Sequence, residues 1–109
     1  MSTVTSETFS GKIYSKLQDV FPDIIPIDRS SLNVWEDYRV TNAIKQTGKD
    51  TIIIAGLWTE VCVTFSALSA IEDGYEVFVV TDACGGTSKE SHDMALQRMI
   101  LVGVKPVTW

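Results

Sequence analysis

Cysteine and histidine are scarce in this sequence, and their scarcity excludes several classes of protein. The 109 residues include two cysteines, one histidine and three prolines. Cys62 and Cys84 are too few for a disulfide framework, so we expect free thiols in a reducing cytoplasm. The sequence has no CxxC or HxxxH spacing, which argues against a zinc site. It also has no GxGxxG motif and no Walker lysine, so no cofactor is expected.

Blocks of basic residues and long apolar runs are also absent. The net charge is −5 and the pI is about 4.6, which argues against binding to nucleic acid or to anionic membranes. No run is long enough to span a bilayer, and residues 1–8 do not resemble a secretory signal. A chain that is 45% hydrophobic and 21% charged is typical of one globular domain, here residues 1–109.

Turn residues divide the chain into alternating strands and helices. Ser10, Asp37 and the Thr87–Glu90 capping box are expected to begin helices, and Gly48, Gly74 and Gly103 to end them. The expected strands are 2–5, 24–28, 51–55, 75–80 and 104–108, and the expected helices are 11–20, 38–47, 60–73 and 88–102. The continuous apolar run 51–55 predicts a strand buried on both faces.

Helical spacing of apolar residues predicts which faces of the helices are buried. The expected inward residues are Ile13, Leu17 and Val20; Val40, Ala43, Ile44 and Thr47; Val61, Phe65, Leu68 and Ile71; and Ala95, Met99 and Val102. The alternation of strands and helices favours an α/β fold with a parallel sheet and helices on its faces. Such folds place their sites at the carboxyl ends of strands, here residues 56–62 and 82–87.

Cys62 lies where the strand 51–55 gives way to a helix. In the first turn of that helix, unpaired N–H groups and the helix dipole would stabilise a thiolate and an oxyanion on a carbonyl under attack. Free cysteines are also common as small buried residues. The residues alone leave both interpretations open.

The pattern Ala-Gly-x-x-Thr-Glu-x-Cys-Val at residues 55–63 resembles the isochorismatase-like cysteine hydrolases, and in particular a branch of uncharacterised hydrolases. The resemblance continues through the remaining segments, which are Phe21-Pro22-Asp23, Arg29, Asn33-Val34-Trp35, 67–70, 74–77, Thr81-Asp82-Ala83, Arg98-Met99 and 106–109. It implies a three-layer α/β/α fold with a doubly wound, Rossmann-like parallel sheet.

The resemblance also implies a triad of cysteine, aspartate and a basic residue. Cys62 matches the nucleophile and Arg29 the basic position, although a surface salt bridge to Asp28 is an alternative for Arg29. Similar proteins have a cis peptide before the threonine, here Trp58–Thr59. Thr59 and the N–H groups of Val61 and Cys62 would then form the oxyanion hole.

Two tryptophans are expected to line the substrate pocket by the same resemblance. They are Trp58 and Trp35, and for Trp58 simple packing in the core is an equal alternative.

The family's first strand and its catalytic aspartate have no counterpart here, so we expect a partial domain that begins in the family's second strand. Asp82, at the end of a strand, is a candidate base, although a turn cap is the favoured interpretation. Asp28 more plausibly pairs with Arg29 or solvent. His92 is expected to be a half-buried helix residue rather than a catalytic base, and Cys84 has no family role.

Three hypotheses follow. The first is a cysteine hydrolase that cleaves a small amide or related C–N bond through a thioester at Cys62. The second is an inactive homologue that serves as an oligomeric structural or binding subunit, because unpaired strand edges require partners. The third is a fragment of a chain with the full triad. A small-molecule substrate and a homo-oligomer are the expected partners.

Overall fold

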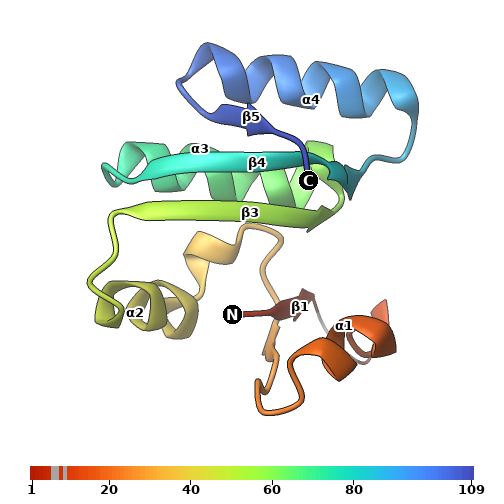
Figure 1. Cartoon of the computed structure of the whole chain (residues 1–109), viewed down its shortest axis with the longest axis vertical. Coiled ribbons are helices and arrows are strands. Elements are labelled where there is room, and N and C mark those ends of the chain that lie inside the picture. Colours follow the sequence, from red (N-terminus) through yellow and green to blue (C-terminus); the bar gives the residue numbers. More distant parts are fainter. Residues whose placement is uncertain (6–7, 9) are drawn as a thin grey trace.

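Strands and helices alternate along the chain in the computed structural model (Figure 1), which describes residues 1–5, 8 and 10–109. The described elements are β1 (Thr3–Thr5), α1 (Ser15–Val20), β2 (Ile27–Arg29), the 3-10 turn η2 (Val34–Glu36), α2 (Tyr38–Gln46), β3 (Thr51–Leu57), the π-helical turn η3 (Thr59–Val63), α3 (Thr64–Glu72), β4 (Glu76–Gly85), α4 (Lys89–Leu101) and β5 (Lys105–Val107). Among these helices, none has the length and apolarity that a membrane crossing requires.

The strands are parallel, and within the described residues they form two sheets. β1 pairs with β2, and β3, β4 and β5 form a second sheet in that order. The arrows of β1 and β3 point the same way in Figure 1, so the carboxyl ends of both sheets face one side of the molecule. The predicted parallel α/β class is confirmed, and the strands stand in two sheets instead of one continuous sheet.

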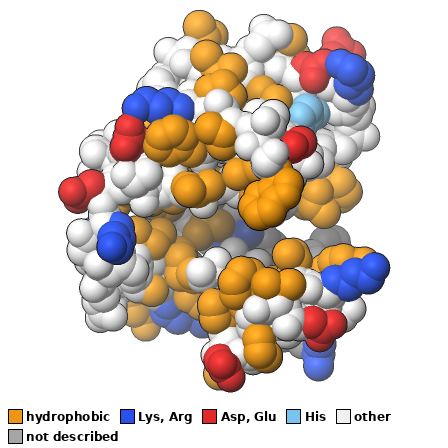
Figure 2. All heavy atoms as spheres, in the orientation of Figure 1, with side chains coloured by type: hydrophobic (Ala, Val, Ile, Leu, Met, Phe, Trp, Pro, Cys, Tyr) orange, Lys and Arg blue, Asp and Glu red, His pale blue; other side chains and the backbone are white. Residues whose placement is uncertain are grey.

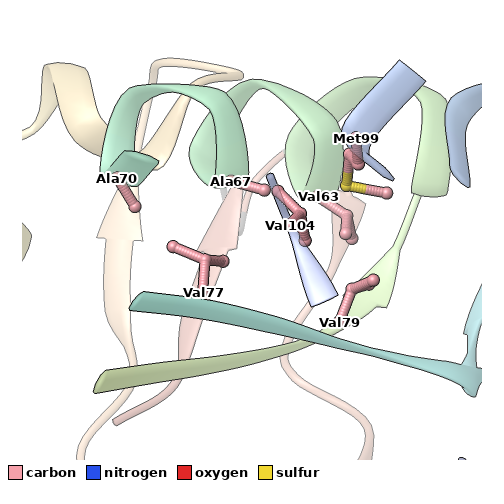
Figure 3. Close-up of a cluster of buried hydrophobic side chains, with 7 residues drawn as sticks. All are labelled: Val63, Ala67, Ala70, Val77, Val79, Met99 and Val104. Atoms are coloured by element: carbon pink, nitrogen blue, oxygen red, sulfur yellow. The ribbon is translucent and has the colours of Figure 1, made fainter. Parts of the chain in front are cut away.

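The core lies between the β3–β4–β5 sheet and the helices α3 and α4, which contribute side chains to the same cluster (Figure 3). Its buried members are Val63, Ala67, Ala70, Val77, Val79, Met99 and Val104. Ala95 and Met99 are buried as predicted, whereas Val102 is 45% exposed.

The prediction that residues 51–55 form a strand buried on both faces is wrong. Successive side chains of a strand point to opposite faces. Ile52 and Ile54 pack against the core, but Ile53 is 69% exposed and Leu57 is 62% exposed. One face of β3 therefore packs against the core, and the opposite face, with these two side chains, is exposed.

The buried face of α3 also differs from the prediction. Val63, Ala67 and Ala70 are fully buried, whereas the predicted residues Val61, Phe65, Leu68 and Ile71 are only half-buried. Both sets have helical spacing. Alanine side chains let the helix approach β4 closely, which explains why the smaller set faces the sheet.

Local signals placed some helix ends correctly. Asp37 caps α2 by accepting from the Arg39 N–H at 3.0 Å, as predicted, and Val40 is fully buried. Thr47, which was expected to be buried, is exposed. The helix ends before Gly48, whose φ of 65° is unfavourable for residues with a side chain.

Two predicted helix starts are wrong. The helix expected at residue 11 begins at Ser15, because Gly11 (φ 80°) and Tyr14 (ψ 125°) both have backbone angles outside the helical region. Leu17 and Val20 of α1 are 53% and 65% exposed. The cap of α4 is Ser88, which accepts from the Ser91 N–H at 3.0 Å, instead of Thr87.

Candidate functional site

The turn η3 connects the carboxyl end of β3 to α3 and carries Cys62. It is a π-helical turn, a rare form that is frequent at functional sites, where an α-helix was predicted. The cis peptide lies one residue earlier than predicted, between Leu57 and Trp58 instead of Trp58 and Thr59. Cys62 is half-buried, and its carbonyl oxygen accepts a hydrogen bond from Ser66 Oγ at 2.6 Å.

The backbone of η3 is partly committed to internal hydrogen bonds. The carbonyl of Trp58 accepts from the N–H groups of Val61 at 3.1 Å and Val63 at 3.2 Å. The Val61 N–H, which was predicted to belong to an oxyanion hole, is therefore occupied. An oxyanion would have to displace the Trp58 carbonyl to use it.

Thr59 is anchored on two sides. It is fully buried, and its Oγ1 lies 2.8 Å from His92 Nδ1 on α4. Its carbonyl accepts from Thr64 Oγ1 at 2.5 Å. His92 is half-buried on α4, as predicted. Its contact with Thr59 is three residues before Cys62 in the sequence.

Glu60 links η3 to the loop before α4. Its Oε1 accepts from the backbone N–H of Thr87 at 2.8 Å and from Thr87 Oγ1 at 2.6 Å. These two hydrogen bonds hold the pKa of the Glu60 carboxyl below its usual range. The carboxylate therefore remains ionised under mildly acidic conditions.

Arg29 ends β2 and is 5% exposed, so its side chain is buried and does not lie on the surface. Its Nε donates to Thr3 Oγ1 at 3.0 Å, and its Nη1 donates to the carbonyl oxygens of Ser31 and Leu32. These acceptors are neutral oxygens. The pKa of the Asp37 carboxyl is lowered mainly by its hydrogen bond from Arg39 and also by the charge of Arg29, so Arg29 already acts on one carboxylate.

The two tryptophans lie in different places. Trp58 is 47% exposed beside the Cys62 turn. Trp35 donates from Nε1 to Asp73 Oδ2 at 2.9 Å, just after α3, and its ring meets that of Tyr75 edge-on at 5.9 Å. Since α3 extends roughly 15 Å away from Cys62, the structure brings Trp58, Thr59 and Val61 to Cys62 but not Trp35.

The other candidates after β4 have separate partners. Asp82 accepts from the backbone N–H of Trp109 at 2.9 and 3.2 Å, so it holds the C-terminal residue instead of capping a turn. β4 continues to Gly85, past the expected end, with an irregularity that pairs Gly56 with Cys84. Burial raises the pKa of the Cys84 thiol, and the nearby Asp82 raises it further.

The sequence analysis did not predict the hydrogen bonds from Thr87 to Glu60, or the close packing of Gly86 against Glu60. Thr87 was taken as a helix cap, although Ser88 was an equally good cap in the sequence. A β carbon on Gly86 would lie 2.7 Å from Glu60 Oε2 and 3.0 Å from His92 Cβ, closer than such atoms normally approach. Thr87 and Ser88 are adjacent and both suit a helix cap, which was the available signal that one of them bonds to another residue.

The comparisons with known proteins agree with this architecture. The model of the isochorismatase domain matches residues 1–109. The probable hydrolase YcaC of Escherichia coli strain K12 is 44% identical over 101 residues, which is 92% of this chain and 49% of YcaC. The crystal structure of that gene product, described as an octameric hydrolase of unknown specificity, superposes with a TM-score of 0.93 over 98% of this chain and 53% of its own.

Two further solved structures are similar. YcaC from Pseudomonas aeruginosa, solved with hexane-2,5-diol and covalent acrylamide, has a TM-score of 0.87 and 41% identity over 91% of this chain and 50% of its own. A pyrazinamidase of Pyrococcus horikoshii in complex with zinc has a TM-score of 0.69 and 29% identity over 80% of this chain and 49% of its own.

The chain spans about half the length of the E. coli relative that it matches. The family model nevertheless covers the whole chain, and the turn with Cys62 lies at the carboxyl end of a parallel strand, where α/β folds place their sites. The chain therefore belongs to the isochorismatase family.

Proposed function

We propose that this protein hydrolyses a small amide, or a related C–N bond, through a covalent intermediate at Cys62. The observation that carries the proposal is the position of Cys62, in a π-helical turn directly after β3 whose neighbouring residues are anchored to α4. The similarity to hydrolases and to a pyrazinamidase supports the reaction class. The covalent acrylamide in the Pseudomonas relative supports a reactive nucleophile.

The proposed reaction has two steps. The Cys62 thiolate attacks the carbonyl carbon, a C–S bond forms, the C–N bond breaks, and the departing amine takes up a proton from water. Water then attacks the thioester, which releases the carboxylic acid and restores the thiol. Arg29 supplies a fixed positive charge for the site, and because a guanidinium does not deprotonate in proteins it acts through charge alone.

The two cysteines provide the test of this proposal. At pH 7 we expect iodoacetamide to modify Cys62 at least about tenfold faster than Cys84, because a thiol of raised pKa has little thiolate at that pH. The modification of Cys84 should become faster as the pH rises above the range in which an ordinary cysteine thiol titrates. Peptide mapping by mass spectrometry measures both rates in one sample.

Chemically unfolded protein is the control for that experiment, since both cysteines should then react at similar rates. Equal rates in the folded protein, or faster modification of Cys84, would contradict an activated Cys62.

We also propose that the protein forms a homo-oligomer. Large apolar side chains are exposed on several elements, and Figure 2 shows apolar side chains gathered on both sides of a hollow. The exposed apolar side chains of the protein include Ile25, which is 88% exposed, and Ile53, which is 69% exposed. Exposed apolar surface of this kind marks association sites, and the octameric E. coli relative supports the same inference.

Light scattering tests the association. We expect a molar mass that is a multiple of the 12.0 kDa chain, and a value of 12.0 kDa at micromolar concentration would rule it out. An oligomer whose Cys62 reacts no faster than Cys84 would favour the second hypothesis, a subunit without catalytic activity.

A further inference from the structure

Two adjacent residues of the Cys62 turn contact the amino-terminal part of α4 or the loop just before it. Thr59 contacts His92 on the first part of the helix, and Glu60 accepts two hydrogen bonds from Thr87 just before it. The turn that carries the proposed nucleophile is thus attached to an element 27 residues later in the sequence. We call the contact between Glu60 and Thr87 the Glu60–Thr87 link.

The surroundings of this link are tightly packed. Gly86 lies against both Glu60 and His92, so closely that a β carbon would come within 2.7 Å of Glu60 Oε2. Among the residues that the structure describes, that second carboxylate oxygen is buried and accepts no hydrogen bond. The attachment to Thr87 therefore runs through Oε1 alone.

The charge does strengthen the link itself. Hydrogen bonds to an ionised acceptor are shorter and stronger than those between neutral groups, and the distances of 2.6 and 2.8 Å to Thr87 fit that class. The lowered pKa of Glu60 has the same cause. A rigid attachment matters at this point because small displacements of a reacting atom reduce rates strongly.

We propose that Glu60 is a positioning residue, whose link to Thr87 holds the Cys62 turn in the geometry that makes the thiol reactive. This inference rests on the proposed function of Cys62 and adds to it the residue that fixes its turn. Glu60 acts through the backbone of η3, two residues before Cys62, and takes no part in bond making.

The test is the ratio of the iodoacetamide rates of Cys62 and Cys84 in folded protein, with Cys84 as the internal reference. In Glu60→Ala we expect this ratio to fall at least about tenfold, since the turn loses its attachment. Glu60→Gln keeps an oxygen acceptor for Thr87 and should restore the ratio to within about threefold of the original. Glu72→Ala, the same change at an exposed glutamate on α3, is the matched control and should leave the ratio unchanged.

A second variant covers the case in which Glu60→Ala does not fold. Thr87→Val removes one of the two donors from the other side and should lower the ratio by a smaller factor, about threefold. Near-ultraviolet circular dichroism establishes that each variant is folded at the assay temperature. A ratio within twofold of the original in folded Glu60→Ala or, if that variant is unfolded, in Thr87→Val would overturn the inference.

The experiment distinguishes failure of the positioning role of Glu60 from failure of the proposed function of Cys62. If the unmodified sequence shows selective reaction at Cys62 and the Glu60 variants keep it, Glu60 has no positioning role and the proposed nucleophile stands. If the unmodified sequence shows no selectivity for Cys62, the proposed function fails and the positioning role falls with it.

Discussion

Replacing Cys62 with alanine is expected to abolish hydrolysis of small amides, with a loss of about 10³-fold or more. The sulfur atom forms the covalent bond in the proposed first step, and no other described side chain of η3 is a comparable nucleophile. The loss should appear in kcat, because the substitution removes a bond made during the reaction and not a contact that binds the substrate. A panel of simple aromatic and aliphatic amides, with ammonia release as the readout, measures it.

Cys84→Ala is the matched control for that experiment. It removes the other thiol, which lies on β4 beside Gly56, and should keep most of the activity. Mass spectrometry of the acrylamide-treated protein gives a second readout, in which the adduct should disappear in Cys62→Ala and persist in Cys84→Ala. Retention of more than a tenth of the activity in Cys62→Ala would remove Cys62 from the mechanism.

Replacing Met99 with alanine is expected to lower the free energy of unfolding by about 2–5 kcal/mol, as large-to-small changes in cores do. Met99 is the largest fully buried side chain among the described residues, and it belongs to the cluster between α3, α4 and the sheet. Domains of this size have only about 5–15 kcal/mol of stability in total. Urea unfolding followed by circular dichroism measures the change.

Met94→Ala provides the comparison within the same helix. Met94 is 52% exposed, so its truncation removes little buried surface and should change the stability by less than about 0.5 kcal/mol. Similar effects of the two substitutions would show that α4 does not contribute to the core as the structure describes.

The features that the sequence predicted well depend on residues close together in the chain. Asp37 caps α2 through a neighbour two residues away, and Gly48 ends the same helix. The order of strands and helices follows from the same kind of local signal. The parallel sheet was inferred correctly because short crossovers of this type have a strong preference for one arrangement.

The features that the sequence did not predict depend on distant segments. The exposure of Ile53 is decided by which helices cover β3, and no pattern within residues 51–57 contains that information. The Glu60–Thr87 link joins residues 27 positions apart, and Trp35 donates a hydrogen bond to Asp73, 38 positions later in the sequence. The position of the cis peptide and the π-helical form of η3 likewise have no separate sequence signal.

Because the strands form two sheets, the two proposed catalytic residues, Cys62 and Arg29, are held by contacts in different parts of the fold. The anchors described here for the Cys62 turn are internal to residues 51–107, whereas Arg29 is held by Thr3, Ser31 and Leu32, beside the β1–β2 pair. Segments of a protein open independently when few contacts join them. Opening of the short β1–β2 pair would therefore move the positive charge of Arg29 while the Cys62 turn keeps its own anchors, so the proposed electrostatic contribution of Arg29 could be lost without unfolding around the thiol.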